Sequence, residues 1–226
     1  MFNVAVILGA GNGTRMGIDK SKMLLEINGK TVIERSVEAF SNLPEIDEII
    51  VVCRECDVEV FSKLIADENV SFVIGGSTRQ ESVKNAVEMI DDCDYLVIHD
   101  GARPLISQKA IINTLDKAIV CGAAATGVRV KDTIKVVDDD LTIVDTPSRS
   151  SLISIQTPQI FKFDLYKKAI EAAEKQGGDY TDDCQLVEHI GQNVFAVIGD
   201  YENIKITTKD DILSAEAIVR ARGEKE

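Results

Sequence analysis

The chain has 226 residues, of which 38 are acidic and 25 basic, giving a formal net charge of −13 at pH 7. Hydrophobic residues make up 45% of it, which is typical of a folded domain and excludes a largely disordered chain. The negative charge argues against a general nucleic-acid-binding protein, which needs a basic face to displace phosphate counterions. A few cations gathered in one cleft would still bind a small anionic ligand.

Apolar runs such as residues 4–8 are of strand length and too short to cross a bilayer, and no secretory signal is visible. We therefore expect a cytoplasmic protein that does not enter a membrane. The five cysteines are an odd number and are scattered, so we expect reduced thiols. Cys53-x-x-Cys56 has no second cysteine pair and is interpreted as structural. With only two histidines, a histidine-rich metal site is excluded.

Strand-like apolar runs alternate with segments of helical spacing along the whole chain. Strands are predicted at Val4–Leu8, Ile49–Cys53, Val70–Ile74, Tyr95–His99, Ala123–Val128 and Val194–Ile198. Helices are predicted to begin at the possible N-caps Thr31, Ser107, Thr181 and Thr208. Several strands are almost continuously apolar, as expected for a sheet covered on both faces. The sequence thus predicts an α/β fold with a doubly wound, mostly parallel sheet.

One stretch departs from this rhythm. Thr133–Val137 and Leu141–Val144 alternate in polarity around three aspartates, which predicts an inserted β-hairpin. Such a hairpin either extends the sheet or forms an arm that reaches a partner subunit, and the pattern alone favours neither. Repeats and linkers are absent from the sequence, so we expect residues 1–226 to form one domain, with the hairpin segment at 130–153.

A glycine-rich segment, residues 8–17, directly follows the first predicted strand and contains Arg15. Glycines there allow backbone N–H groups to approach phosphate oxygens closely. Thr14 and Met16 stand where the dinucleotide fingerprint needs glycine, and Leu24 stands where the Walker pattern needs it. The loop is therefore predicted to bind phosphate in another way, with Arg15 and Lys22 neutralising a triphosphate.

Two further predicted strands end in polar groups on the same edge of the sheet. Asp100 ends one of them, and a carboxylate in that position is a natural ligand for Mg²⁺. Arg103 beside it would hold a second phosphate. Gly75-Gly76-Ser77, followed by Arg79 and Ser82, ends the other strand and would read a base through backbone groups and a hydroxyl.

Seven motifs together carry a resemblance to a known family. They are the glycine loop with Arg15 and Lys22, Gly75-Gly76-x-x-Arg79-x-x-Ser82, His99-Asp100-Gly101-Ala102-Arg103-Pro104, Asp132-Thr133-Ile134-Lys135, Gln156-Thr157-Pro158-Gln159, Thr181-Asp182 and Asn203-Ile204-Lys205-Ile206-Thr207. In this order they closely resemble the 2-C-methyl-D-erythritol 4-phosphate cytidylyltransferases of the non-mevalonate isoprenoid pathway. The resemblance extends from Val4 to about Arg220.

The resemblance implies a Rossmann-like nucleotidyltransferase fold, a homodimer, and a hairpin that serves as the dimerisation arm. It implies that CTP and methylerythritol 4-phosphate condense with Mg²⁺, or another divalent cation, and release pyrophosphate. It also assigns roles to residues of this chain. Arg15 and Lys22 would stabilise the transition state, and Lys205 and Arg149 would position the attacking phosphate, with Arg149 supplied by the partner's arm. Asp100 would bind ribose and metal. The other nucleotide contacts would be Ala10, Gly11, Gly13, Gly75 and Ser82. The pocket for the alcohol phosphate would be lined by Arg103, Thr133, Thr157 and Thr181.

The sequence departs from the family pattern at three positions. The family usually has proline at Ser21, alanine at Gly101 and often aspartate at Glu202. We expect these changes to affect rate more than identity. The nearest alternative is a ribitol-5-phosphate cytidylyltransferase, a sister family, and an alternative of another class is a non-catalytic nucleotide sensor.

Overall fold

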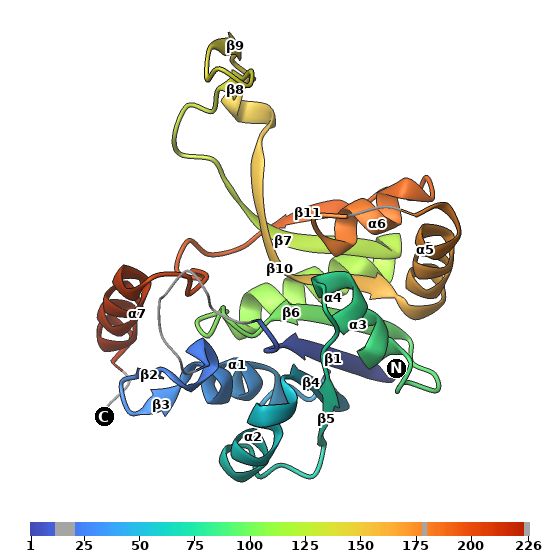
Figure 1. Cartoon of the computed structure of the whole chain (residues 1–226), viewed down its shortest axis with the longest axis vertical. Coiled ribbons are helices and arrows are strands. Elements are labelled where there is room, and N and C mark those ends of the chain that lie inside the picture. Colours follow the sequence, from blue (N-terminus) through green and yellow to red (C-terminus); the bar gives the residue numbers. More distant parts are fainter. Residues whose placement is uncertain (12–20, 178–179, 224–226) are drawn as a thin grey trace.

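The computed structural model describes residues 1–11, 21–177 and 180–223. Within them, seven strands form one sheet in the order β11-β7-β10-β6-β1-β4-β5 (Figure 1). Their bounds are β1 (Asn3–Leu8), β4 (Glu48–Cys53), β5 (Val70–Ile74), β6 (Tyr95–Asp100), β7 (Ala123–Arg129), β10 (Ile153–Lys162) and β11 (Phe195–Ile198). Strands β1, β4, β5 and β6 are parallel, as are β7 and β11. The predicted α/β fold with a mostly parallel sheet is confirmed.

Strand β10 is the strand of the main sheet that the sequence did not predict. It lies antiparallel to both of its neighbours, β6 and β7, and joins the two parallel parts of the sheet. Polar residues and Pro158 interrupt its apolar pattern, and its pairing with β7 shifts register between Ile155 and Gln159. An irregular strand of this kind shows neither a continuous apolar run nor a regular alternation.

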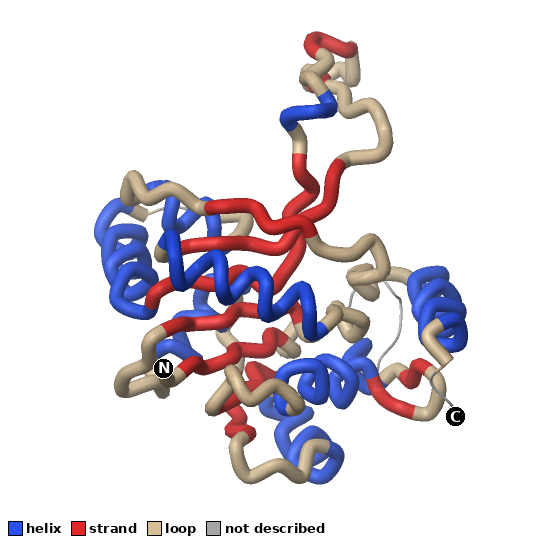
Figure 2. The backbone as a smooth tube through the Cα atoms, turned by 180° about the vertical axis from the view of Figure 1, so that it is seen from behind, coloured by secondary structure: helices blue, strands red, loops and turns tan. Residues whose placement is uncertain are grey.

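Helices cover both faces of the sheet (Figures 1 and 2). In β1, Ala5 and Ile7 belong to one core cluster and Val4 and Val6 to the other, because successive side chains point to opposite faces. The first cluster includes residues of α1 (Val32–Ser41), α2 (Val58–Leu64), α4 (Gln108–Cys121) and α7 (Lys209–Ala221). The second includes residues of α3 (Arg79–Val87), α5 (Phe163–Gln176) and α6 (Asp183–His189). Shorter elements are η2 (Lys22–Leu24), β2 (Glu26–Ile27), β3 (Lys30–Thr31), η3 (Glu55–Asp57) and η4 (Arg149–Ser151).

Three of the four predicted N-caps are confirmed. Thr31 and Thr208 form capping boxes at α1 and α7, and the Ser107 hydroxyl caps α4. The prediction for Thr181 is wrong, since Asp182 caps α6 by accepting a hydrogen bond from Gln185 N at 2.9 Å. A carboxylate suits this position because its charge also interacts favourably with the positive end of the helix dipole.

The segment between β7 and β10 projects away from the sheet and is called the arm below (Figure 1). It contains the predicted hairpin, but the strands are shorter than expected, β8 (Val136–Val137) pairing with β9 (Ile143–Asp145). The prediction that Thr133 begins a strand is wrong. The arm is exposed along its length and packs on no second layer in the described chain, so little apolar burial supports a longer ladder. Its exposed apolar side chains are Ile134, Val136, Val137, Leu141, Ile143 and Val144.

In the part of the chain that the structure describes, no helix combines the length and apolar character needed to cross a bilayer. All five cysteines lie in that part and are free thiols, as expected.

Candidate active site

The carboxyl ends of β1, β4, β5 and β6 border a pocket of about 710 Å³. The strand register explains why they meet, because Leu8 pairs with Val52 on one side and with Asp100 on the other. Seven of the residues predicted from the sequence line this pocket, namely Ala10, Gly11, Lys22, Gly75, Ser82, Asp100 and Lys205. They come from distant parts of the chain, so the fold assembles the site that the motifs predict.

One wall of the pocket is a tightly packed turn after β5. A Cβ atom on Gly75 would lie 2.5 Å from the Cβ of Ala10, so this position requires glycine. The Ser82 hydroxyl accepts a hydrogen bond from Gly76 N at 3.0 Å and donates one to Thr78 O at 2.8 Å. The hydroxyl thus holds the turn in place.

Asp100 lies at a second wall of the pocket, among three cations. Its carboxylate oxygens lie 2.8 Å from Lys205 Nζ, 3.4 Å from Arg103 Nε and 3.9 Å from Arg79 Nε. Burial alone would raise the pKa of the Asp100 carboxyl, but the neighbouring cations outweigh it and lower the pKa to about 2. Arg79 also pairs with Asp183, so three cations meet two carboxylates here, and the remaining positive charge favours anionic ligands.

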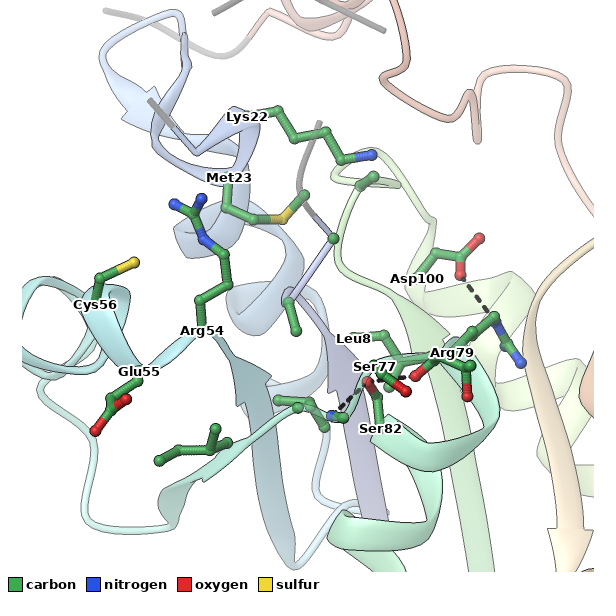
Figure 3. A pocket seen from close by; sticks show the side chains of 18 of the residues that line it. Leu8, Lys22, Met23, Arg54, Glu55, Cys56, Ser77, Arg79, Ser82 and Asp100 are labelled. Atoms are coloured by element: carbon green, nitrogen blue, oxygen red, sulfur yellow. Dashed lines mark hydrogen bonds and ion pairs between the residues drawn. The ribbon is translucent and has the colours of Figure 1, made fainter. Parts of the chain in front are cut away.

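Lys22 adds a fourth cation near this wall. Its Nζ donates a hydrogen bond to Ile206 O at 3.4 Å, next in the chain to Lys205. Figure 3 shows the Lys22 side chain extending toward the side of the pocket that holds Asp100. The two lysine side chains therefore lie on the same side of the pocket.

The buried side chain of His99 helps to hold Asp100 in place through Thr157. His99 Nδ1 lies 3.0 Å from Thr157 Oγ1, and the same hydroxyl oxygen accepts a hydrogen bond from Asp100 N at 2.9 Å. Arg103 O lies 3.1 Å from His99 Nε2 and can only accept, so the ring proton is on Nε2 and the Thr157 hydroxyl donates to Nδ1. Thr157, predicted to line the alcohol-phosphate pocket, is 3% exposed and holds the backbone of Asp100.

Burial lowers the pKa of His99 to about 4, below its ordinary value of 6.5. The unfolded chain therefore binds a proton that the folded chain excludes between these values, and stability falls as pH drops through this window. Wild type should lose about 3 kcal/mol across it, and His99→Gln should lack this loss. Urea unfolding at several pH values between 7 and 4, in metal-free buffer, measures the difference. The prediction would be contradicted if the difference in unfolding free energy between wild type and His99→Gln did not shrink toward pH 4.

Of the remaining predicted site residues, those that the structure describes do not line the pocket. Gly13 and Arg15 lie outside the described residues. Thr133 and Arg149 lie on the exposed arm, where Arg149 Nη1 donates to Lys131 O at 2.8 Å. Thr181 is exposed just before α6. Arg103 is absent from the pocket lining, but its side chain pairs with Asp100, which does line the pocket.

The structure also brings in residues to which the sequence assigned no role. Arg54 and Cys56 line the pocket opposite Asp100, and Asp57 fixes the Arg54 guanidinium through bonds of 2.7 and 2.9 Å (Figure 3). Arg79 was part of a motif but carried no assigned function. The sequence did not indicate that Asp183 pairs with Arg79, because nothing in the local pattern around Asp183 links it to α3.

Two departures from the family pattern fit their surroundings. Ser21 caps η2 and has φ −56° and ψ 129°, a conformation that proline also adopts. Gly101 N donates to Leu8 O at 3.0 Å, and a Cβ there would lie 2.9 Å from that oxygen. Alanine at Gly101 would therefore require a small shift of the backbone beside Asp100.

Comparison with known proteins supports the same conclusion. The family model described as 2-C-methyl-D-erythritol 4-phosphate cytidylyltransferase matches residues 3–221. A relative of that name from Clostridium perfringens is 44% identical over 221 residues, covering 96% of this chain and 98% of the relative. One from Caldanaerobacter subterraneus is 45% identical over 222 residues, covering 96% and 98%.

Solved structures give the same result for the fold. The 4-diphosphocytidyl-2C-methyl-D-erythritol synthase from Anaerococcus prevotii has a TM-score of 0.88 and 34% identity, covering 97% of this chain and 96% of that one. The 2-C-methyl-D-erythritol 4-phosphate cytidylyltransferase from Thermus thermophilus has a TM-score of 0.81 and 29% identity, covering 97% and 100%. Sequence, pocket and comparisons agree, and the chain belongs to the 2-C-methyl-D-erythritol 4-phosphate cytidylyltransferase family.

Proposed function

We propose that the pocket binds CTP and methylerythritol 4-phosphate together and joins them by in-line attack of the substrate phosphate on the α-phosphorus of CTP. As a member of its family the chain is a cytidylyltransferase, whose products are 4-diphosphocytidyl-methylerythritol and pyrophosphate. The observation that carries the mechanism is the grouping of Lys205, Arg103 and Arg79 around Asp100, with Lys22 nearby. The turn at Gly75 and Ser82 faces the same pocket and suits the cytidine.

In this reaction a bond forms between a phosphate oxygen of the substrate and the α-phosphorus, and the bond from the α-phosphorus to the bridging oxygen of pyrophosphate breaks. The attacking phosphate is already ionised, so no general base is needed. His99 fits this view, because both of its ring nitrogens are occupied and burial keeps the ring neutral. Catalysis then rests on positioning and on charge neutralisation.

Each cation has a proposed part in this step. Lys22 and Arg15 stabilise the charge that moves onto the leaving pyrophosphate, and Lys205 positions the attacking phosphate. Arg103 holds the substrate phosphate. In support, Arg103 lies beside Asp100, with its Nε 3.4 Å from that carboxylate. Thr181 is proposed to bind the same substrate from the start of α6.

A divalent cation fits the donor set around Asp100. The described residues contain no group of three or more side chains that would hold a metal alone. Mg²⁺ typically takes one or two carboxylates and completes its shell with substrate phosphates and water. Asp100 lines the pocket and would provide the carboxylate, with the triphosphate as the second ligand. When bound, Mg²⁺ would neutralise phosphate charge that the lysines do not reach.

The arm is proposed to pair two chains into a homodimer. Its exposed apolar side chains at residues 134–144 would be costly to leave in water, and burial against a second copy would remove that cost. Arg149 and Thr133 lie on the same exposed arm and do not line the pocket of their own chain. We propose that they complete the partner's alcohol-phosphate site.

Pyrophosphate release tests the choice of substrate. Purified protein with CTP and Mg²⁺ is offered methylerythritol 4-phosphate and ribitol 5-phosphate in parallel, and turnover is expected with the first alone. Turnover with ribitol 5-phosphate alone would keep the nucleotide site but reject the proposed alcohol pocket. Absence of turnover with both would favour a nucleotide sensor.

A further inference from the structure

Arg79, the first residue of α3, contacts carboxylates on two sides. Its Nη2 donates a hydrogen bond to Asp183 Oδ2 at 2.5 Å, and its Nε lies 3.9 Å from Asp100 Oδ1. Figure 3 shows the guanidinium beside Asp100. Arg79 therefore connects the end of β6, which lines the nucleotide pocket, with the start of α6.

Asp183 is firmly held at the other end of this connection. Its side chain is 4% exposed, and its second oxygen accepts a hydrogen bond from the fully buried Tyr166 hydroxyl at 2.6 Å. Both carboxylate oxygens are thus engaged. A buried charge of this kind is costly without its cationic partner, so Arg79 and Asp183 stay together.

The start of α6 is also the segment that presents Thr181. Gln159 of β10 bonds to Asp182 Oδ2 at 3.1 Å and accepts from Cys184 N at 3.0 Å. The position of Thr181 relative to Asp100 therefore depends on two links, one through Gln159 and one through the Arg79–Asp183 pair.

We propose that Arg79 is a positioning residue that fixes the nucleotide side of the site relative to the side that binds the alcohol phosphate. This rests on the proposed function, in which Asp100 serves CTP and Thr181 serves methylerythritol 4-phosphate. A planar guanidinium is needed because two of its nitrogens contact different carboxylates. A lysine ammonium is a single point charge and would reach one of them.

Two variants separate the two contacts. Asp183→Asn removes the negative charge opposite Arg79 and so weakens the link to α6, and should raise KM for methylerythritol 4-phosphate about tenfold, with KM for CTP changing less than about twofold. Arg79→Lys keeps a positive charge but contacts one carboxylate at most, so the connection between the two sides is lost and both KM values should rise about tenfold. In a double-mutant cycle on KM for the alcohol phosphate, the double variant should be no worse than the worse single variant.

Two control variants distinguish positioning from general stability. Lys84→Met removes a cation of the same helix that pairs with Glu174 of α5, outside the pocket. Tyr166→Phe removes a hydrogen bond from Asp183 but keeps its pair with Arg79. Both controls should leave the two KM values within about twofold of wild type, including where Tyr166→Phe lowers the melting temperature.

Steady-state kinetics with each substrate varied, together with thermal unfolding, decide the outcome. Lower melting temperatures with unchanged KM values for Arg79→Lys and Asp183→Asn would overturn the positioning role. If Asp183→Asn does not fold, Arg79→Lys alone decides, because it keeps a positive charge opposite Asp183. Wild-type turnover in the same assay tests the proposed function separately, since failure there would leave no substrate KM to compare.

Discussion

Replacing Lys22 with alanine is expected to lower kcat about 10²- to 10³-fold, the usual effect of removing one charged or hydrogen-bonding group that stabilises a transition state. The fold should remain intact, because Lys22 lies on the short η2 at the edge of the pocket and its side chain is partly exposed. Pyrophosphate release at saturating CTP and methylerythritol 4-phosphate gives kcat, and circular dichroism with thermal unfolding checks the fold.

Lys30→Ala is the matched control for this variant. Lys30 is an exposed lysine eight residues along the chain, paired with Glu38 at 2.6 Å and absent from the pocket lining. Removing it should leave kcat unchanged, because exposed ion pairs contribute at most about 1 kcal/mol to stability and nothing to this reaction. Near-normal turnover of Lys22→Ala would exclude Lys22 from the catalytic step.

Asp100→Asn is expected to lower kcat about 10³-fold, with a lower affinity for Mg²⁺. The change removes the proposed metal ligand and also the anion that holds Lys205 and Arg103, so both cations would shift from the positions that receive phosphate. The variant should also unfold at a lower temperature, since losing a charged hydrogen-bond partner costs about 1–3 kcal/mol.

The experiment measures pyrophosphate release over a range of Mg²⁺ concentrations. Asp200→Asn is the control, since Asp200 is an exposed aspartate that bonds to Ser107 and does not line the pocket. Full recovery of Asp100→Asn at high Mg²⁺ would mean that Asp100 binds metal but does not organise the cations. A normal kcat at all concentrations would contradict both roles.

The sequence by itself determined most of the scaffold and the phosphate-facing side of the site. Short continuous apolar runs such as those in β1 and β4 are typical of strands buried on both faces, and three cap residues placed helix starts correctly. Motifs at the ends of these strands predicted a common pocket, because carboxyl ends of parallel strands meet at one edge. Ala10, Gly75 and Asp100 were found for this reason, whereas Lys205 follows none of these strands and was predicted only from the family resemblance.

Only the tertiary structure decided the features that depend on contacts between distant segments. β10 carries no regular pattern, and it becomes a strand because β6 and β7 offer it hydrogen-bond partners on both sides. The arm has short strands because nothing in the described chain covers it. The pair of Arg79 and Asp183 joins residues 104 positions apart, and no local propensity or spacing encodes such a contact. The attraction between these two buried opposite charges exists only once the chain has folded and brought them together.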